Sequence, residues 1–328
     1  MRKRNVLVVS LLLLAMISSA FAQGTAEKAD GAANYPVKNI EFTVPYSAGG
    51  GTDGLMRLMT AAMEKDLGKP IVVINRGGNL GQIGLTELSS KKADGYSIGA
   101  LSNLDHILVL LTGTNVAYDY DSFEYIGAIN TTANVIIASK QSGITSLEEM
   151  ISAAKAKPGN LTVSISGKTH IAEVALVEQA AGIKMTTVMQ SSGGNSLNAL
   201  LGGHVDLAVL DKKFVAQVEG QGCPTLAILS DSRSIAVPEV PTISELGYDV
   251  ATETYRVIIA PKGTPKEILS IISDSMKRVT STKEFQDKMA AVGEEYRFLT
   301  SAEVKARLDK DYKSMVQLVK DLPEAFGN

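Results

Sequence analysis

Residues Val44–Gly54 read V-P-Y-S-A-G-G-G-T-D-G and connect a predicted strand at 39–44 to a predicted helix at 55–67. A glycine-rich turn lets several backbone N–H groups point at one spot, and the start of a helix adds about half a positive charge there. The segment therefore predicts a strand–loop–helix unit whose loop binds an anion. Asp53 is expected to cap the helix.

Strands and helices alternate along the rest of the chain. The predicted strands are short and rich in Val and Ile, as buried parallel strands are, and lie at 39–44, 71–75, 96–100, 135–138, 161–165, 205–210, 226–229 and 256–260. Elements that alternate in this way predict an α/β protein with mostly parallel sheets.

Helix ends carry signals of their own. Pairs of Ser or Thr with a Glu three residues later predict capping boxes at Ser146 with Glu149, Ser281 with Glu284 and Thr300 with Glu303. Thr264 is expected to cap a helix whose first residue is Pro265. Gly182 is expected to end the helix that begins near Thr169.

A second strand–loop–helix unit has the same character as the first. The predicted strand at 161–165 runs into Ser166-Gly167-Lys168-Thr169-His170, where small residues and hydroxyls again stand at a helix start. A third and weaker case is 191–196, before a helix at 197–201. Two anion-receptive helix starts in different parts of the chain predict a clamp, in which each half offers donors to an acidic ligand.

An enzymatic reading of the first loop remains as an alternative. Gly49, Gly51 and Gly54 satisfy the dinucleotide pattern G-x-G-x-x-G, which needs an acidic residue about 20 positions on. Arg76 stands there instead and would suit a 2′-phosphate, so an NADP-linked enzyme stays open. His170 lies beside the second loop, but the sequence shows no nucleophile and orienting acid for it. We therefore predict no catalytic residue and no cofactor.

Composition excludes several other classes. The 32 Lys and Arg residues against 35 Asp and Glu leave no basic excess for a nucleic-acid binder. A single cysteine, Cys223, rules out an internal disulfide framework and a cysteine-rich metal site. No two of the three histidines have the i,i+4 spacing of a zinc-binding helix.

The N-terminus has the pattern of an export signal. Basic Arg2-Lys3-Arg4 precedes an apolar stretch at 6–17 and the small residues of Ser19-Ala20-Phe21-Ala22, so cleavage is expected after Ala22. Without residues 1–22 the chain keeps 29 basic against 35 acidic residues, and its net charge falls from −3 to −6. No cysteine stands near the cleavage site, so no lipid anchor is predicted. Residues 23–34 read as a flexible leader.

Several blocks together resemble the periplasmic solute receptors of tripartite tricarboxylate transporters, also called Bug receptors. The blocks follow one another in the family's order from about Tyr35 to the C-terminus, and are 44–53, 75–84, 94–96, 154–161 with 166–170, 201–206, 238–247 and 260–265. Each block alone is weak evidence, whereas their order and spacing are specific.

The resemblance implies a type II periplasmic binding protein, an α/β protein of two domains around a ligand cleft. Domain 1 would comprise 35–133 and 251–328, and domain 2 would comprise 134–250. The ligand would be a small organic acid anion: a di- or tricarboxylate, an acidic amino acid or an aromatic acid. The receptor would be a monomer and would deliver it to a permease of one large and one small membrane subunit. A sensory receptor for the same ligand is an alternative.

The resemblance and the loops together give the expected ligand-binding residues. These are Tyr46, Ser47, Ala48, Gly49, Gly50, Thr52, Asp53, Arg76, Ser166, Gly167, Lys168, Thr169, His170, Asp211 and Tyr255. Tyr255 stands where the family has Trp and is followed by Arg256, and Val257 stands where Gly is usual. Lys168 stands in the second loop, where small residues are commoner. If either cation faces the cleft, the ligand is expected to be more anionic than is usual in the family.

Overall fold

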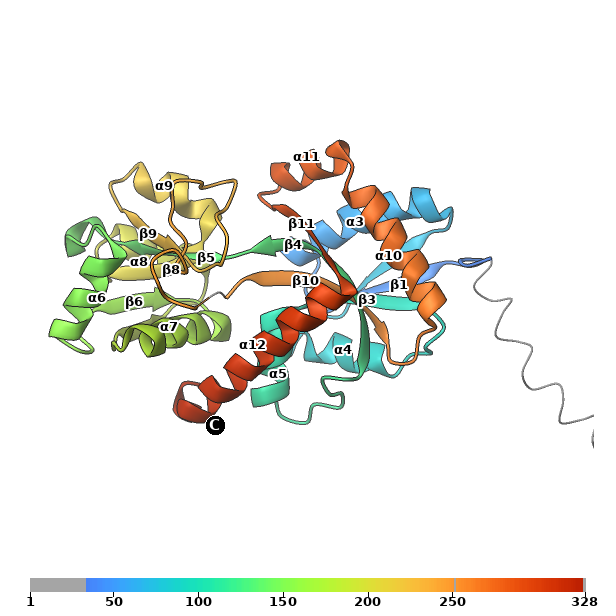
Figure 1. The fold of residues 1–328 in the computed structure, drawn as a ribbon, viewed down its shortest axis with the longest axis horizontal. Helices are drawn as coiled ribbons and strands as arrows, with labels where there is room; N and C mark the ends of the chain where they lie inside the picture. The colour runs from blue at the N-terminus through green and yellow to red at the C-terminus, as the bar shows by residue number, and fades with distance from the viewer. Residues whose placement is uncertain (1–33, 251, 327–328) are drawn as a thin grey trace, which may run out of the picture.

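The computed structural model describes residues 34–250 and 252–326, which form two α/β lobes (Figure 1). The predicted signal peptide at 1–22 and nearly all of the predicted leader at 23–34 lie outside the described residues. One lobe is built on a six-stranded sheet and the other on a five-stranded sheet. We call them the six-stranded lobe and the five-stranded lobe.

The six-stranded sheet has the strand order β11-β4-β10-β3-β1-β2. Its strands are β1 (Ile40–Val44), β2 (Ile71–Asn75), β3 (Ser97–Ser102), β4 (Phe123–Thr132), β10 (Thr254–Pro261) and β11 (Tyr296–Thr300). Apolar side chains on both faces bury this sheet under helices, and its central strands are almost without solvent exposure.

Helices cover both faces of the six-stranded sheet (Figure 1). They are α3 (Gly51–Leu67), α4 (Gln82–Ser89), α5 (Asn103–Thr112), α10 (Lys266–Thr280), α11 (Lys283–Ala291) and α12 (Ser301–Asp321). Met56 and Met59 of α3 and Met276 of α10 pack in one core, whereas Ile107 of α5 and Leu308 of α12 pack in the other. Helix α3 follows β1 after residues 45–50, so it begins near the carboxyl end of β1.

The five-stranded sheet has the strand order β7-β6-β8-β5-β9. Its strands are β5 (Asn134–Ala138), β6 (Thr162–Ile165), β7 (Thr186–Met189), β8 (Leu207–Asp211) and β9 (Thr225–Ile228). Its helices are α6 (Leu147–Ala156), α7 (Lys168–Ala181), α8 (Gly193–Leu201) and α9 (Val215–Glu219). Short 3-10 helices in the chain lie at 79–81, 140–142, 212–214 and 323–326.

The chain passes twice between the lobes. Strand β4 leads through Ala133 into β5, and the segment 229–253 returns from β9 to β10. The two passages lie side by side, because Thr132 of β4 pairs with Thr254 of β10. Helix α12 also reaches the five-stranded lobe, where Gln179 of α7 donates to Asp321 at 3.2 Å (Figure 1).

The prediction of mostly parallel sheets is wrong. Strand β1 runs parallel to β2 and β3, and β6 runs parallel to β7 and β8, but β10 is antiparallel to both of its neighbours. Strands β11 and β4 are also antiparallel, as is β5 to β8 and β9. The double passage explains the antiparallel β4–β10 and β5–β9 pairs, since a strand that returns to a lobe beside the strand that left it must run the opposite way.

The predicted helix ends are partly correct. Thr300 forms the full capping box with Glu303, Ser146 caps α6, and Gly182 ends α7 with a φ of 62°. Two predicted caps are wrong. Pro265 rather than Thr264 precedes the first residue of α10, and Thr282 rather than Ser281 caps α11. Thr264 instead donates its hydroxyl hydrogen back to the Pro261 carbonyl at 2.7 Å.

Within residues 34–250 and 252–326, no helix combines the length and apolar character that a membrane crossing requires.

Candidate functional site

Helix α3 begins without a side-chain cap. It starts at Gly51, four residues earlier than the sequence predicts, and Gly50 occupies the cap position with no hydrogen bond from a side chain. The first amides of a helix have no acceptor within the helix, so those of Gly51 and Thr52 remain available to a partner. Gly50 and Gly51 are exposed to solvent. This helix start fits an anion.

Asp53 does not cap the helix, contrary to the sequence expectation. It is the third residue of α3, buried, and accepts hydrogen bonds from the Gly49 amide at 2.9 Å, Asn75 at 2.9 Å and Arg57 at 2.9 Å. Burial alone would raise its pKa, but these donors outweigh burial and lower the pKa. Asp53 therefore holds the glycine turn in place, and the Gly49 amide is already used.

The loop after β2 packs close to the first loop, and Gly84 of α4 lies against both of them. A Cβ atom at Gly84 would lie 2.7 Å from the Arg76 carbonyl oxygen and 2.9 Å from the Pro45 side chain, so only glycine fits this contact. The Arg76 side chain is exposed and pairs with Glu87 at 3.0 Å. Arg76 thus contributes its backbone to the support of the loop and turns its guanidinium away from it.

A chain of hydroxyl groups links the two lobes beside the start of α3. The Tyr46 hydroxyl donates to Asp105 Oδ2 at 3.1 Å and accepts from the Ser102 amide at 3.2 Å. Thr169, at the start of α7 in the other lobe, donates to Asp105 Oδ1 at 3.2 Å. Burial raises the pKa of Asp105, while the two hydroxyl donors and the charge of Arg256 oppose that rise. Asp105 is therefore a residue of the candidate site that the sequence analysis did not identify.

Helix α7 also begins without a side-chain cap. Gly167 takes the cap position with a φ of 102°, a conformation that favours glycine. His170 Nδ1 accepts the Ser166 amide at 3.0 Å, which leaves the ring hydrogen on Nε2. Burial lowers the pKa of His170 to about 4, against the charge of Asp211, so the ring is neutral at neutral pH. This helix start offers amides and a neutral imidazole donor.

The third predicted loop differs from the first two. Ser192 caps α8 by accepting from the Asn195 amide at 3.2 Å. One of the donors at this helix start is thus satisfied within the chain. The contrast leaves α3 and α7, one in each lobe, as the uncapped starts among the three loops that the sequence singled out.

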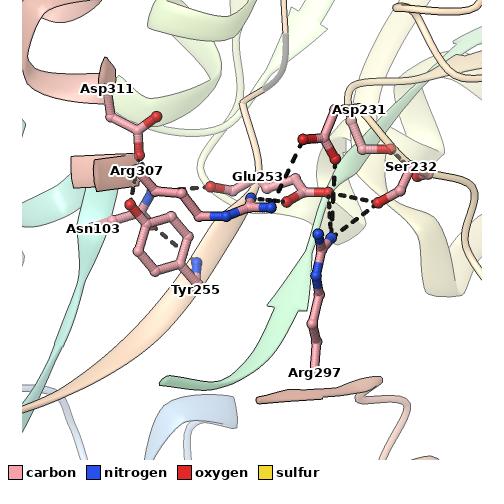
Figure 2. Close-up of polar contacts among 9 residues, drawn as sticks. Asn103, Asp231, Ser232, Glu253, Tyr255, Arg297, Arg307 and Asp311 are labelled. Atoms are coloured by element: carbon pink, nitrogen blue, oxygen red, sulfur yellow. Dashed lines mark hydrogen bonds and ion pairs between the residues drawn. The ribbon is translucent and has the colours of Figure 1, made fainter. Parts of the chain in front are cut away.

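Two further predicted site residues, Tyr255 and Lys168, point elsewhere, whereas Asp211 lies close enough to His170 for its charge to act on that ring. Tyr255 is buried, with its hydroxyl donating to Asp311 at 2.8 Å and its amide donating to Asn103 at 3.0 Å (Figure 2). Lys168 reaches the end of α5, where Nζ lies 3.4 Å from the Thr112 hydroxyl. Asp211 accepts from the Lys213 amide at 3.0 Å.

Arg256 follows Tyr255 and projects from the opposite face of β10. Its Nε–H is directed at the Thr52 hydroxyl at 3.5 Å, and its side chain is 15% exposed. Its positive charge acts on both Tyr46 and Asp105. Arg256 therefore lies at the start of α3 together with the residues of the hydroxyl chain. Ser47 and Ala48 are exposed in the turn before α3.

Within the described residues, no three His, Cys, Asp or Glu side chains gather in a way that would hold a metal ion.

The chain matches the family model described as "Tripartite tricarboxylate transporter family receptor" over residues 55–322. It belongs to this family. BugT of Bordetella pertussis is 27% identical to the receptor over 288 residues, which are 86% of this chain and 88% of BugT. The family resemblance drawn from the sequence is thus confirmed.

Solved structures resemble the receptor over most of its length. A TctC solute-binding protein from Polaromonas is 27% identical, with a TM-score of 0.80 over 88% of this chain and 100% of that chain. Two Rhodopseudomonas palustris proteins share the fold at 24% identity. One, determined with adipate, has a TM-score of 0.69 over 89% and 98% of the two chains, and MatC with bound malate has 0.67 over 87% and 100%.

The receptor has the two-domain α/β fold of type II periplasmic binding proteins, as the resemblance implied. Members of its family are solute-binding receptors and not enzymes, so the alternative of an NADP-linked enzyme is overturned. The structure gives the physical reason. A Cβ atom at Gly54 would meet nothing within 4 Å, so Gly54 does not make the close helix–strand contact of the dinucleotide fingerprint, and Arg76 faces Glu87 rather than the turn.

Proposed function

We propose that this receptor binds a small organic anion between its lobes and delivers it to a permease of one large and one small membrane subunit. One carboxylate would accept the amides of Gly51 and Thr52 at the start of α3. The start of α7 would face the other end of the ligand with Ser166 and His170. The relatives with adipate and with malate support a carboxylate as the ligand.

The observation that carries the proposal is the pairing of two uncapped helix starts, one from each lobe, across the Tyr46–Asp105–Thr169 contact. A micromolar ligand needs about 8 kcal/mol of net binding free energy. A hydrogen bond to a charged group contributes about 1.5–3 kcal/mol. Four to six such bonds are sufficient in gross terms, before the losses of ordering and desolvation.

The domain boundaries follow from the same proposal. Domain 1 would comprise 35–133 and 251–328, domain 2 would comprise 134–250, and the two passages between β4 and β5 and between β9 and β10 would act as the hinge.

Export would remove residues 1–22 and leave a monomer in the periplasm without a lipid anchor. Mass spectrometry of the secreted protein tests this directly, because it should begin at Gln23.

A thermal-shift screen of the mature protein against organic acids tests the ligand class. A ligand at 100 times its dissociation constant adds about 2.7 kcal/mol to the free energy of unfolding. We expect a dose-dependent rise in Tm with at least one di- or tricarboxylate, and none with nucleotides. If no acid in a broad panel raises Tm at millimolar concentration, the proposed function is wrong.

A further inference from the structure

Arg256 is nearly buried and lacks a close partner for its charge. Its Nη1 atom is shielded from solvent and has no hydrogen-bond acceptor. The nearest acid to it is Glu294, whose Oε2 lies 3.9 Å away and already accepts from Asn130 at 2.7 Å. The Nε contact to Thr52 is at the 3.5 Å limit of a hydrogen bond. A buried guanidinium normally has a close, well-aligned acceptor.

The position of this cation makes its isolation more costly. Thr52 is the second residue of α3, so the guanidinium lies beside the end of the helix that carries a partial positive charge. A helix start is stabilised by an anion and destabilised by a cation. The two positive features therefore repel each other unless an anion lies between them.

The other acids near this point are already engaged. Asp53 turns to Arg57, Asn75 and the Gly49 amide. Asp105 accepts the hydroxyl groups of Tyr46 and Thr169. Among the described residues, no carboxylate lies within hydrogen-bond distance of the Arg256 guanidinium. The described residues therefore give this guanidinium only the 3.9 Å contact with Glu294 and no close, hydrogen-bonded carboxylate.

We propose that Arg256 forms an ion pair with the carboxylate that the amides at the start of α3 receive, and that it determines the selectivity of the receptor for an ionised acid at that end of the ligand. This inference rests on the proposed function. Arginine presents two parallel N–H groups to a carboxylate, which a neutral amide or ester cannot accept equally well. Arg256 would thus let the receptor discriminate an ionised acid from its neutral amide or ester.

Isothermal titration of the mature protein with succinate, malate, adipate and citrate tests the inference. Arg256→Gln should weaken the tightest of these probes at least tenfold, since one hydrogen bond between charged groups exceeds about 1.4 kcal/mol, a factor of ten. Arg256→Lys keeps the charge and should recover part of the affinity. Arg278→Gln, on α10 and paired with Asp66, makes the same change of net charge and should leave the affinity unchanged.

Glu294→Gln gives a change of the opposite sign. Glu294 competes with the ligand for Arg256, and glutamine keeps an oxygen for Asn130. We expect Glu294→Gln to raise the affinity several-fold. A merely structural Arg256–Glu294 pair predicts instead that both variants lower the Tm of the ligand-free protein and that Glu294→Gln gains no affinity. Our account predicts that Arg256→Gln leaves the ligand-free Tm unchanged or higher.

The outcomes separate the two proposals. If the wild-type receptor binds a probe and Arg256→Gln binds it equally well, Arg256 is not a ligand-binding residue, and the proposed function stands. If wild-type protein binds neither these four acids nor any acid of the thermal-shift panel at millimolar concentration, the proposed function fails and the inference fails with it. Tenfold weaker binding by Arg256→Gln, with Arg278→Gln unaffected, supports both.

Discussion

Asp53 shows how one buried carboxylate fixes the geometry of the anion-receptive turn. It joins the Gly49 amide, the Asn75 amide group and the Arg57 guanidinium at one point. The amides of Gly51 and Thr52 follow directly on this anchored turn. The residue therefore shapes the site without offering itself to an anion.

Asp53→Ala should lower the free energy of unfolding by about 2–3 kcal/mol, because it leaves several donors without their charged acceptor. Asp53→Asn should lose less, since it keeps one acceptor oxygen. Urea denaturation measures both changes. A loss of about 1 kcal/mol or less for Asp53→Ala would indicate a simple helix cap instead.

The buried Glu173 predicts that the stability of the folded protein depends on pH. It is buried in α7, accepts from Asn134 at 2.9 Å, and burial raises its pKa to about 8. Below about pH 4.5 the side chain is protonated in both the folded and unfolded chains. Between about pH 4.5 and 8 only the unfolded chain ionises, so stability falls as the pH rises. Above about pH 8 the loss is complete.

Glu173→Gln should therefore stabilise the protein at pH 7.5 by more than about 1.4 kcal/mol and leave it unchanged at pH 4. Thermal unfolding at the two pH values measures the difference. The exposed Glu219→Gln in the same lobe is the control and should shift neither. An equal gain at both pH values would assign the effect to packing rather than to ionisation.

The sequence could identify the loops but not every side chain that faces them. The glycines and hydroxyl groups at both helix starts are visible as local patterns. Asp105 and the orientation of Arg256 are not, because both depend on strands and helices that meet only in the folded chain. Arg76 shows the opposite case. The sequence predicted that it binds the ligand, but its guanidinium pairs with Glu87 and points away from the glycine turn.

At the scale of the element, the anion binding that we propose for α3 depends on the absence of a side-chain cap at its start. Its Gly50 has φ −76° and ψ 167°, which other residues adopt readily, and a Cβ there would lie 3.3 Å from the Ser47 carbonyl oxygen. An acidic side chain at this position would place its carboxylate over the amides that we assign to the ligand.

Gly50→Asp should therefore weaken carboxylate binding at least tenfold while changing the free energy of unfolding by less than about 1 kcal/mol. Gly50→Ala is the matched control, because it adds the same Cβ contact without the carboxylate. Titration calorimetry and urea denaturation give the two quantities. Equal affinities of the two variants would show that the amides of α3 do not receive the ligand.

The strands that the sequence analysis missed have two physical causes. Strand β4 contains Gly127 and ends in the polar run Asn130-Thr131-Thr132. Strands β7 and β11 lie at the edges of their sheets, where side chains remain partly exposed and the apolar signal is weak. Buried central strands such as β1 and β5 were correctly predicted because burial on both faces selects Val and Ile.

At the scale of the molecule, an ionic cluster fastens the returning passage to the six-stranded lobe. Glu253 is buried and pairs with Arg307 of α12 at 2.8 Å and with Arg297 of β11 at 3.5 Å (Figure 2). Asp231 lies 3.8 Å from Arg307 and 3.9 Å from Arg297. Both ends of the passage at 229–253 are thereby held by the same two arginines of the six-stranded lobe.

Arg307→Gln should lower the free energy of unfolding by more than about 1 kcal/mol, because it removes the closest partner of a buried carboxylate. The double variant Glu253→Gln/Arg307→Gln should lose less than the sum of the two single variants. A double-mutant cycle measured by urea denaturation gives the coupling free energy. Strictly additive losses would show that the pair does not fasten the passage.

A crystal structure with the tightest-binding acid of the panel would locate the carboxylate that we place at the start of α3, between the lobes. We predict a carboxylate oxygen at hydrogen-bond distance, about 2.7–3.2 Å, from the amides of Gly51 and Thr52. A ligand bound away from these amides, for instance in the 230 Å³ cavity between α3 and α11, would contradict the account.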